Sequence, residues 1–345
     1  MSAPSKNIVP AGSDFFEIRI QSVQADRPLP YDLYLWVGSR PVLFRKRRDE
    51  LKSDRAQRLI QHGGEKFFIP NDQRVLYMAS LKNIVHDPSA STEDKSKYIK
   101  ETAFVHVNNL FTKQDVAPII TEAQNLIEDM VSFVSTDIDA VASLLRLSTH
   151  DYYTYNHCVD VAVYSIALAK RIWGEDRELL KRAGMGGLLH DIGKRNVPIE
   201  IINKKSKLTP EEWDEIKRHP SYGKNLIDSI PSISKDSKLV VLEHHENFDG
   251  TGYPSRLKGD EISKLARLVS IADVFDALTT NRSYHHAIKP SEALGKMFGM
   301  QPGKFDPQIF KQFNQDLTLH SDVKLADDFD PCSANDFSKL IKKLT

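Results

Sequence analysis

The stretch "LEHHENFDGTGYPSR", Leu242–Arg256, places two adjacent histidines directly before a run rich in turn-forming residues. His244 and His245 close an apolar segment with the periodicity of a helix, and imidazole is the commonest metal ligand among side chains. Gly250 and Gly252 follow, and glycine permits the positive φ angles of sharp turns. The stretch therefore predicts a helical fold in which one helix end presents two ligands to an interior site and the chain then turns away abruptly.

The overall composition is that of a folded protein of about two domains. The chain has 345 residues, of which 40% are hydrophobic and 27% charged. Lys+Arg and Asp+Glu both total 47, so the chain lacks the net positive charge that would indicate binding of a nucleic-acid polymer. No apolar run approaches the ~18 residues of a membrane span. The first residues lack the apolar core of a signal peptide, so none is expected. Cys158 and Cys332 are too isolated for a disulfide framework, which favours the reducing cytoplasm.

Residues 1–86 are predicted to form a small α/β module, mostly β, with a regulatory or interaction role. Alternation of apolar and polar residues indicates strands, and "SDRAQRLIQHGG" indicates a short helix capped by Ser53. The basic cluster that begins at Arg45 contains interleaved acids, so a solvated face is favoured over a phosphate site. The predicted strands are "FFEIRI" (15–20), "DLYLWV" (32–37), "EKFFIP" (65–70) and "RVLYMASL" (74–81).

The remainder of the chain is predicted to be helical. A polar, Pro- and Ser-containing segment from His86 marks a boundary. Residues 87–136 are expected to be a linker and leading helices, and residues 137–320 the main domain. Residues 321–345 are expected to be a tail with a short helix.

Histidine and aspartate residues of the main domain fall at the ends of predicted helices. His157 lies near the start of an apolar helix. His190 and Asp191 end another, with Gly193 as a C-terminal breaker. His219 is expected to end a further helix, stopped by the proline that follows it.

The helix expected to end at His219 begins with a capping signature. Thr209 is the expected cap, Pro210 occupies the first helical position, and Glu212 reaches back to the cap. A later helix, "ISKLARLVSIADVFDALTTNR", has an apolar side that Asp273 and Asp276 interrupt. A carboxylate in such surroundings is costly unless it is paired, hydrogen-bonded or bound to a metal.

Taken singly, each of these side chains has an ordinary explanation, because a lone histidine on an apolar face is usually a hydrogen-bonded core residue. Seven of them from five helices can instead converge inside a bundle, where all-α folds build metal sites. Mixed imidazole and carboxylate donors suit iron, manganese, nickel or zinc better than calcium or magnesium. Seven ligands suit two ions bridged by an aspartate and a hydroxide, so we predict a two-metal hydrolase site. The seven are His157, His190, Asp191, His219, His244, His245 and Asp273.

Several of these segments together resemble the HD-GYP family of bacterial phosphodiesterases, within the wider HD phosphohydrolase superfamily. The segments are "HDIGK" at His190, "HHE" at His244, "DGTGYP" at Asp249 and "ADVFDALTTNRSY" at Ala272. The resemblance spans about residues 137–311 and excludes the first module and the tail. It implies a mainly α fold, an HD-type helical bundle with a binuclear metal centre.

The resemblance implies hydrolysis of cyclic di-GMP to linear pGpG, to GMP, or to both. It implies that the seven residues above bind two divalent ions, with iron favoured over manganese, nickel or zinc, and that Asp191 bridges them. Lys194 would hold a phosphate oxygen or the attacking hydroxide. Asp276 would support the ligands from behind, and Arg282 with Tyr284 would line the substrate side. Lys194 also has a purely structural explanation. A basic side chain near the C-terminus of a helix is stabilised by the helix macrodipole.

The turn formed by Gly252, Tyr253 and Pro254 has three candidate roles. Tyr253 could cover the metal site, present a surface to a diguanylate cyclase (GGDEF) domain, as the resemblance implies, or simply pack over the turn.

The sequence departs from the family pattern at several positions. Tyr153 stands where some members have a glutamate for a third metal, and Asn247 where arginine is common. "RSYH" replaces the usual "RPYR" or "RPYK", so Ser283 and His285 stand where Pro and a basic residue are expected. The change from a basic residue leaves a second hypothesis open. In it, the chain is a receptor or adaptor of low activity that binds nucleotide or a cyclase domain. A third hypothesis is a hydrolase of another nucleotide.

Overall fold

The structure is a computed structural model. It describes residues 14–62, 66–85, 87–136, 140–146, 153–204, 206–280, 287–300 and 303–319. Within these ranges, no helix has both the length and the apolar character needed to cross a membrane. The chain divides into two compact units, residues 1–102 and 103–345, and the division falls inside helix α3. The four-part division expected from the sequence stays a prediction.

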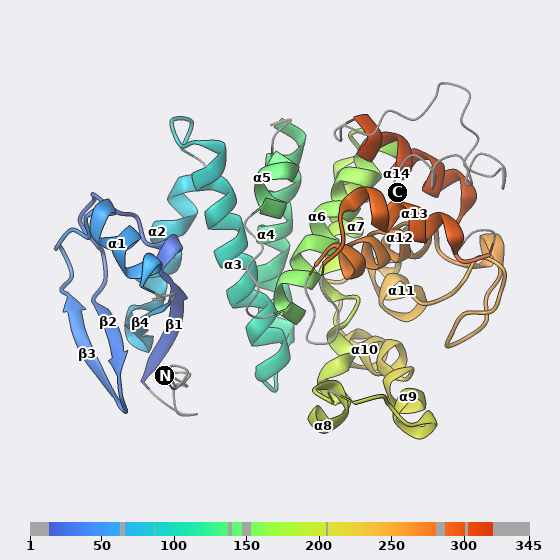
Figure 1. Ribbon diagram of the computed structural model, residues 1–345, viewed down its shortest axis with the longest axis horizontal. Coiled ribbons are helices and arrows are strands. Elements are labelled where there is room, and N and C mark those ends of the chain that lie inside the picture. Colours follow the sequence, from blue (N-terminus) through green and yellow to red (C-terminus); the bar gives the residue numbers. More distant parts are fainter. Residues whose placement is uncertain are drawn as a thin grey trace. The chain divides into compact units, whose positions relative to one another are not determined.

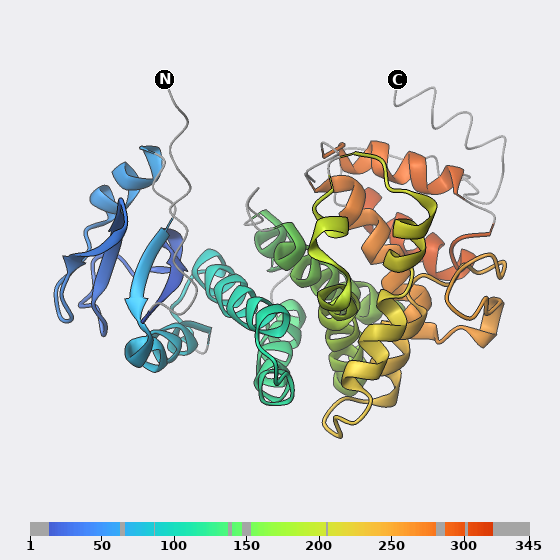
Figure 2. The same cartoon turned by 90° about the horizontal axis from the view of Figure 1, so that it is seen from below.

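The first unit is built on a four-stranded antiparallel sheet in the order β1-β4-β2-β3 (Figures 1 and 2). Three of the predicted strands are confirmed, and β3 is an additional edge strand. Pro41 lies in β3, where the missing N–H costs no ladder hydrogen bond to a further strand. The strands are β1 (Phe15–Arg19), β2 (Leu33–Val37), β3 (Arg40–Arg45) and β4 (Lys66–Pro70).

The fourth predicted strand, residues 74–81, is wrong, because this segment lies in helix α2 (Arg74–Val85). Tyr77 and Leu81, one helical turn apart, are both buried, and the Tyr77 ring contacts the ring of Tyr31. A short apolar run fits a strand or a helix equally well, and here tertiary packing decides for the helix.

The predicted helix at residues 53–64 is confirmed as α1 (Ser53–Gln61), but Ser53 is its first residue and not its cap. The Ser53 hydroxyl instead donates to Asp26. Helix α3 (Thr92–Thr112) begins after Ser91, whose hydroxyl accepts from the Asp94 N–H at 3.1 Å. Ser91 therefore caps the N-terminus of α3.

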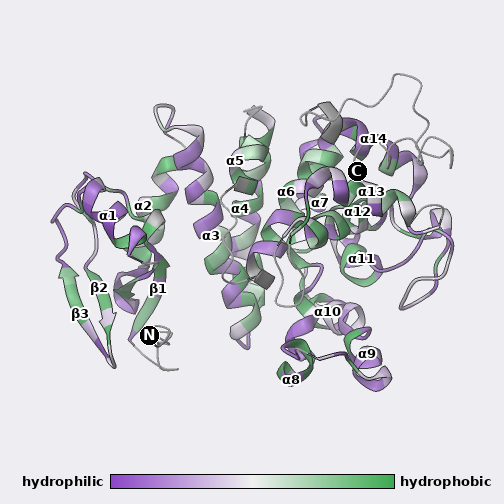
Figure 3. Ribbon diagram, in the orientation of Figure 1, coloured by the Kyte–Doolittle hydropathy of each residue, from purple (hydrophilic) through white to green (hydrophobic). Residues whose placement is uncertain are grey.

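In the described residues of the second unit, all regular secondary structure is helical (Figure 1). Helix α6 packs against α7 and α12, and α11 packs against α7, α10 and α12. Hydrophobic colouring runs along α6 and α12 in Figure 3, whereas α9 is mostly hydrophilic. The helices are α4 (Ala117–Thr136), α5 (Ala140–Arg146), α6 (Tyr153–Trp173), α7 (Arg177–Leu189), α8 (Ile199–Ile202), α9 (Pro210–Ile216), α10 (His219–Ile227), α11 (Lys235–Glu243), α12 (Lys264–Thr279), α13 (Pro290–Gly299) and α14 (Pro307–Leu319).

The capping box predicted at the start of α9 is confirmed. The Thr209 hydroxyl accepts from the Glu212 N–H at 3.2 Å, and the Glu212 carboxylate accepts from the Thr209 N–H at 2.7 Å. The predicted end of this helix at His219 is wrong. Helix α9 ends at Ile216 and His219 begins α10, because the proline after it lies in the first turn, where a missing N–H costs nothing.

Gly193 is needed for close packing and not for a positive φ. It lies in a 3₁₀ turn after α7, and a Cβ there would meet the carbonyl oxygen of His219 at 1.9 Å and the backbone nitrogen of Gly223 at 2.4 Å. Gly193 is therefore required for this close backbone contact, and not as the helix breaker that the sequence predicted. The turn after α7 and the start of α10 touch backbone to backbone, which brings residues on either side of them into one site.

Candidate metal centre

The seven predicted ligands come together at the centre of the helical unit, from the ends or faces of five helices. His157 lies near the start of α6, and Asp273 lies on α12. The others lie at the end of α7, the start of α10 and the end of α11. Their ligand atoms fall into two groups, within each of which all atoms lie within 4.8 Å of one another. The groups are Asp191, His219, His244 and His245, and His157, His190 and Asp273.

Four histidines have one ring nitrogen held by a hydrogen-bond acceptor behind them. Nδ1 of His190 donates to Gly187 O at 2.7 Å, and Nδ1 of His219 donates to Ile216 O at 2.8 Å. Nδ1 of His244 lies 3.1 Å from Val241 O, and Nδ1 of His157 lies 2.6 Å from Asp276 Oδ2. Carbonyl and carboxylate oxygens only accept, so each Nδ1 carries the proton. In a neutral ring this leaves a lone pair on Nε2 that is directed into the site, the arrangement typical of metal-bound histidine.

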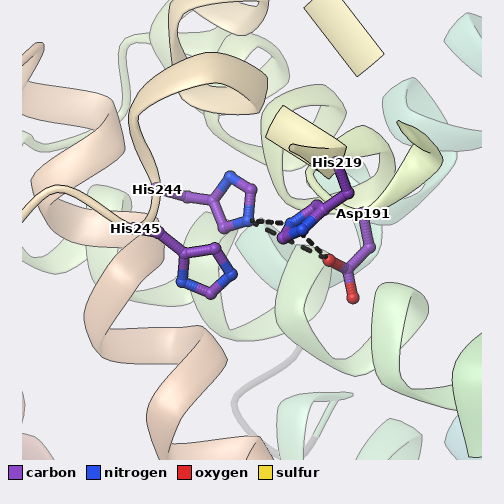
Figure 4. Close-up of side chains that lie close together, drawn as sticks. All are labelled: Asp191, His219, His244 and His245. Carbon is purple, nitrogen blue, oxygen red and sulfur yellow. Dashed lines mark hydrogen bonds and ion pairs between the residues drawn. The ribbon is translucent and has the colours of Figure 1, made fainter. Parts of the chain in front are cut away.

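These lone pairs face one another, which indicates that the site is built for a cation. Nε2 of His219 lies 3.2 Å from Nε2 of His244 and 3.2 Å from Asp191 Oδ1. Figure 4 shows these side chains directed toward one another. None of these atoms has a proton to donate when the imidazoles are neutral. Nε2 of His190 and Oδ1 of Asp191 are buried and have no hydrogen-bond partner among the described residues. Buried acceptors left in this state are costly, and a divalent ion is what this donor set fits.

Asp191 lies between the two groups and presents one oxygen to each. Its Oδ1 faces His219, whereas its Oδ2 lies 3.4 Å from His190 Nε2 and 3.8 Å from His157 Nε2. The side chain is buried, and burial alone would favour the neutral acid. The charge of Lys194 and the contacts with His190 outweigh burial and hold the pKa of Asp191 well below its usual range. The carboxylate is therefore ionised and has the position of a bridging ligand.

His157 lies between two carboxylates. Its Nε2 is 3.1 Å from Asp273 Oδ1, and Asp276 accepts from its Nδ1. Burial lowers the pKa of His157, but the hydrogen bonds and charges of Asp273 and Asp276 outweigh it and raise the pKa to about 9. In the metal-free protein a proton on Nε2 thus occupies the position that a metal would take. Asp276 is buried behind His157, and its supporting role stays a prediction.

The pKa values of His244 and His245, at the end of α11, are shifted in the opposite direction from that of His157. Burial, with the neighbouring histidines, holds the pKa of His244 well below its usual range. Burial also lowers the pKa of His245 to about 3. Both rings are therefore neutral at pH 7, as metal ligation requires.

Lys194 contacts the bridging position directly. Its Nζ donates to Asp191 Oδ2 at 2.5 Å, and its side chain is 30% exposed. A charge at the rim of the site with one face toward solvent can meet an incoming anion. The role expected for Lys194 on substrate stays a prediction.

The turn after His245 folds back over the site. The ring of Tyr253 lies against the ring of His245, with centroids 4.8 Å apart, and the Tyr253 N–H donates to His245 O at 3.2 Å. Gly250 has a φ of +87°, as predicted, but Gly252 is required by space. A Cβ on Gly252 would lie 2.2 Å from the backbone nitrogen of Asn247. Tyr253 therefore covers one of the ligands, and Pro254 beside it is exposed.

Glu246 has a structural role that was not predicted from the sequence. This carboxylate is buried and accepts from the N–H groups of Ser255 at 2.6 Å and Leu257 at 3.1 Å, which fixes the returning arm of the turn. Its place directly after two histidines, in a sequence that turns sharply, was the available signal.

Some expected residues fall outside the described part of the chain. These are Arg282, Tyr284, Ser283 and His285 of the "RSYH" segment, and the tail from residue 320 onward. The backbone of Tyr153 belongs to α6, but its side chain is likewise outside the description.

Comparison with known proteins agrees with this geometry. Residues 142–309 match the family model described as the HD domain. The resemblance to the HD-GYP family, made on the motifs, is confirmed by the relatives. The chain is 42% identical over 191 residues to a cyclic di-GMP phosphodiesterase of Pseudomonas aeruginosa, covering 55% of this chain and 46% of that protein.

Two further comparisons bear on substrate and fold. The chain is 37% identical to 3'3'-cGAMP-specific phosphodiesterase 3 of Vibrio cholerae over 49% of this chain and 36% of that protein. A solved structure, described as an HDG"Y"P protein of Bdellovibrio bacteriovorus, has the same fold. Its TM-score is 0.72 at 22% identity, and the match covers 88% of this chain and 100% of that one. The chain spans less than half the length of these two curated relatives.

Proposed function

We propose that the chain is a metal-dependent phosphodiesterase that hydrolyses cyclic di-GMP to linear pGpG, to GMP, or to both. The observation that supports this most strongly is Asp191, an ionised carboxylate with one oxygen toward each group of ligands. The 42% identity to a cyclic di-GMP phosphodiesterase supports the substrate.

The two groups would hold two divalent ions, with Asp191 shared between them. When bound, such ions lower the pKa of water and neutralise charge on phosphoryl oxygens. Iron is the favoured metal, with manganese, nickel and zinc as alternatives, because imidazole and carboxylate donors are mixed here.

The protein's own residues would position and neutralise the substrate. Lys194 would donate a hydrogen bond to a phosphoryl oxygen, where negative charge builds up as the phosphodiester is attacked. Asp276 would keep the proton of His157 on Nδ1, so that Nε2 remains a ligand. Tyr253 would exclude water from the side of the site formed by His245. Arg282 and Tyr284 remain the proposed residues of the substrate side.

A related dinucleotide, 3'3'-cGAMP, is the second candidate substrate, because a 37%-identical relative bears that specificity in its name. One experiment separates these alternatives. The protein is purified without oxygen with Fe²⁺ or Mn²⁺ supplied and incubated in parallel with cyclic di-GMP and 3'3'-cGAMP. Chromatography follows the products, and elemental analysis counts metal ions per chain.

About two ions per chain with turnover of cyclic di-GMP would support the proposal. Turnover of 3'3'-cGAMP alone would contradict the proposed substrate but support the proposed phosphodiesterase reaction. Two ions per chain with no turnover of either nucleotide would contradict the phosphodiesterase proposal and favour the hypothesis of a receptor or adaptor. In that case the next measurement would be binding of a GGDEF domain to the exposed side of the Tyr253 turn.

A further inference from the structure

The segment at residues 303–304 is fixed against the turn that covers the metal centre. The Asp249 N–H donates to Gly303 O at 2.8 Å, and the Phe248 N–H donates to Lys304 O at 3.1 Å. Gly303 has a φ of +133°, and a Cβ there would lie 2.5 Å from Asp249 Oδ2. Only glycine fits this contact without strain, so the position of the Lys304 backbone is set by the turn.

The Lys304 amine is held beside the site but is poorly satisfied there. Its Nζ donates to Asn247 Oδ1 at 3.5 Å, a long hydrogen bond, while Asn247 Nδ2 is engaged with Thr251 Oγ1 at 2.9 Å. Within the ranges that the structure describes, no carboxylate lies within 4.0 Å of this amine. A lysine ammonium has three protons to donate, so at least two of them lack a protein acceptor in this part of the chain.

Lys304 is also half-buried and lies within electrostatic reach of the centre. Burial lowers the pKa of Lys304, and the charges of Asp273 and Asp249 oppose that shift only in part. Its Nζ lies 5.8 Å from the centroid of the Phe305 ring, which limits its access to solvent on that side. A lysine whose task was only to neutralise Asp273 or Asp249 would be expected to form an ion pair with one of them. Lys304 forms neither pair.

Lys194 provides the comparison, because its amine is already bonded to Asp191 at 2.5 Å. The Lys304 amine, in contrast, forms a single long hydrogen bond to the described residues, so its other donors remain available. Two bound divalent ions would change the net charge near the Lys304 amine from negative to positive. The amine would then be attracted less by Asp273, and an anion would become its favoured partner.

We propose that Lys304 is an anion-binding residue that holds a phosphate group of the substrate at the edge of the metal centre, beside Asn247. The inference rests on the proposed function in that the phosphate belongs to a cyclic dinucleotide. The site itself would recognise any phosphate that reaches it.

The test uses the full-length, metal-loaded protein and the variant Lys304→Met, which keeps the length of the side chain and removes its charge. Calorimetry measures the Kd of inorganic phosphate, and steady-state kinetics measure KM and kcat for cyclic di-GMP. Lys304→Arg, which keeps the charge, and Lys311→Met, which removes an exposed lysine of α14, are the controls.

Lys304→Met is expected to raise both the phosphate Kd and KM about tenfold or more, since a charge-assisted hydrogen bond is lost. Metal content and melting temperature should stay unchanged. Lys304→Arg should recover at least part of the affinity, and Lys311→Met should behave as wild type.

A phosphate Kd and a KM within twofold of wild type would overturn the inference, as would loss of metal or of folding in Lys304→Met, which would make the residue structural. Failure of the proposed function gives a different result. The wild type would then leave cyclic di-GMP intact, and the phosphate Kd of the variants would still decide the role of Lys304.

Discussion

Ionisable side chains gather in two regions of this protein, and the regions differ in burial and in pairing. One is the metal centre of the helical unit. The other is a surface hollow of about 550 Å³ in the first unit, on and around α1. The hollow is lined by Arg45, Lys52, Asp54, Arg55, Arg58, Leu59 and His62.

In the hollow the charges are satisfied by water and by one another. Arg58 pairs with Asp54 at 2.5 Å with side chains 70% and 62% exposed, and Lys52 pairs with Glu50 at 2.5 Å. This matches the solvated face expected from the interleaved acids. In the metal centre the acceptors are buried and face one another, and a bound cation would satisfy them. A cluster of charged residues is therefore a weak sign of a site, whereas buried acceptors without donors are a strong one.

The largest expected effect is at the shared carboxylate. Asp191→Ala should deplete bound metal and reduce turnover by about a thousand-fold or more, because both groups lose a ligand. Elemental analysis and product chromatography on the same sample measure both. Asp214→Ala, which removes an exposed carboxylate of α9, is the control and should change neither. A variant at position 191 that kept its metal and its rate would refute the bridging role.

Lys194→Ala should separate charge stabilisation from metal binding. We expect kcat to fall by about a hundred-fold while metal content is unchanged, because the amine acts on charge that develops during the reaction. Metal analysis beside steady-state kinetics distinguishes the two effects. Loss of metal would show that Lys194 serves mainly to hold Asp191 in its ionised state.

Gly252→Ala and Gly38→Ala compare a glycine required by space with one required by backbone angle. In the helical unit, a Cβ at position 252 meets backbone atoms at 2.2 and 2.5 Å, so we expect a loss of about 3 kcal/mol or more. In the first unit, Gly38 has a φ of +63° and open space around it, so we expect about 1–2 kcal/mol.

Hydrogen exchange, measured separately over residues 14–102 and 103–319, gives the free energy of opening in each unit. Equal losses at positions 252 and 38 would mean that the Tyr253 turn moves aside easily. That result would weaken the conclusion that this turn is a fixed cover.

Asp276→Asn tests the protonation of His157. A metal must displace the proton that His157 holds up to a pKa of about 9, so wild-type metal affinity should rise with pH and level off near pH 9. The variant removes one of the charges that raise this pKa, so its affinity should level off at a lower pH.

At pH 9, Asp276→Asn should bind metal about ten- to a hundred-fold more weakly, because the imidazole has lost the carboxylate behind it. Near pH 7 the difference in metal affinity between the wild type and the variant should be smaller, because the proton on His157 competes less with the metal in the variant. Competition with a metal-binding dye at both pH values measures this. Parallel pH profiles for the two proteins would exclude the proton on His157 as the competitor.

The smallest effect is expected in the hollow. Arg58→Ala removes an exposed ion pair, and such pairs add little because water solvates both partners. Melting temperature, metal content and turnover should all remain at wild-type values. A clear loss of any of them would show that the hollow has a role that its exposed pairs do not indicate.

The sequence by itself determined the features that depend on near neighbours. The capping box at Thr209 is an example, because its two hydrogen bonds join residues three positions apart. The placement of His157 and His244 near helix ends is another, since apolar periodicity locates the helices. The identity of the seven candidate ligands followed from these patterns together with the family resemblance.

Only the tertiary structure decided what depends on distant contacts. Residues 74–81 became a helix because Tyr77 packs on Tyr31, and Gly193 proved to be a contact with α10. Lys304 lies against the turn that follows His245 through backbone pairing with residues more than fifty positions earlier. No local pattern records such pairings, because their free energy comes from packing between segments that meet only when the chain is folded.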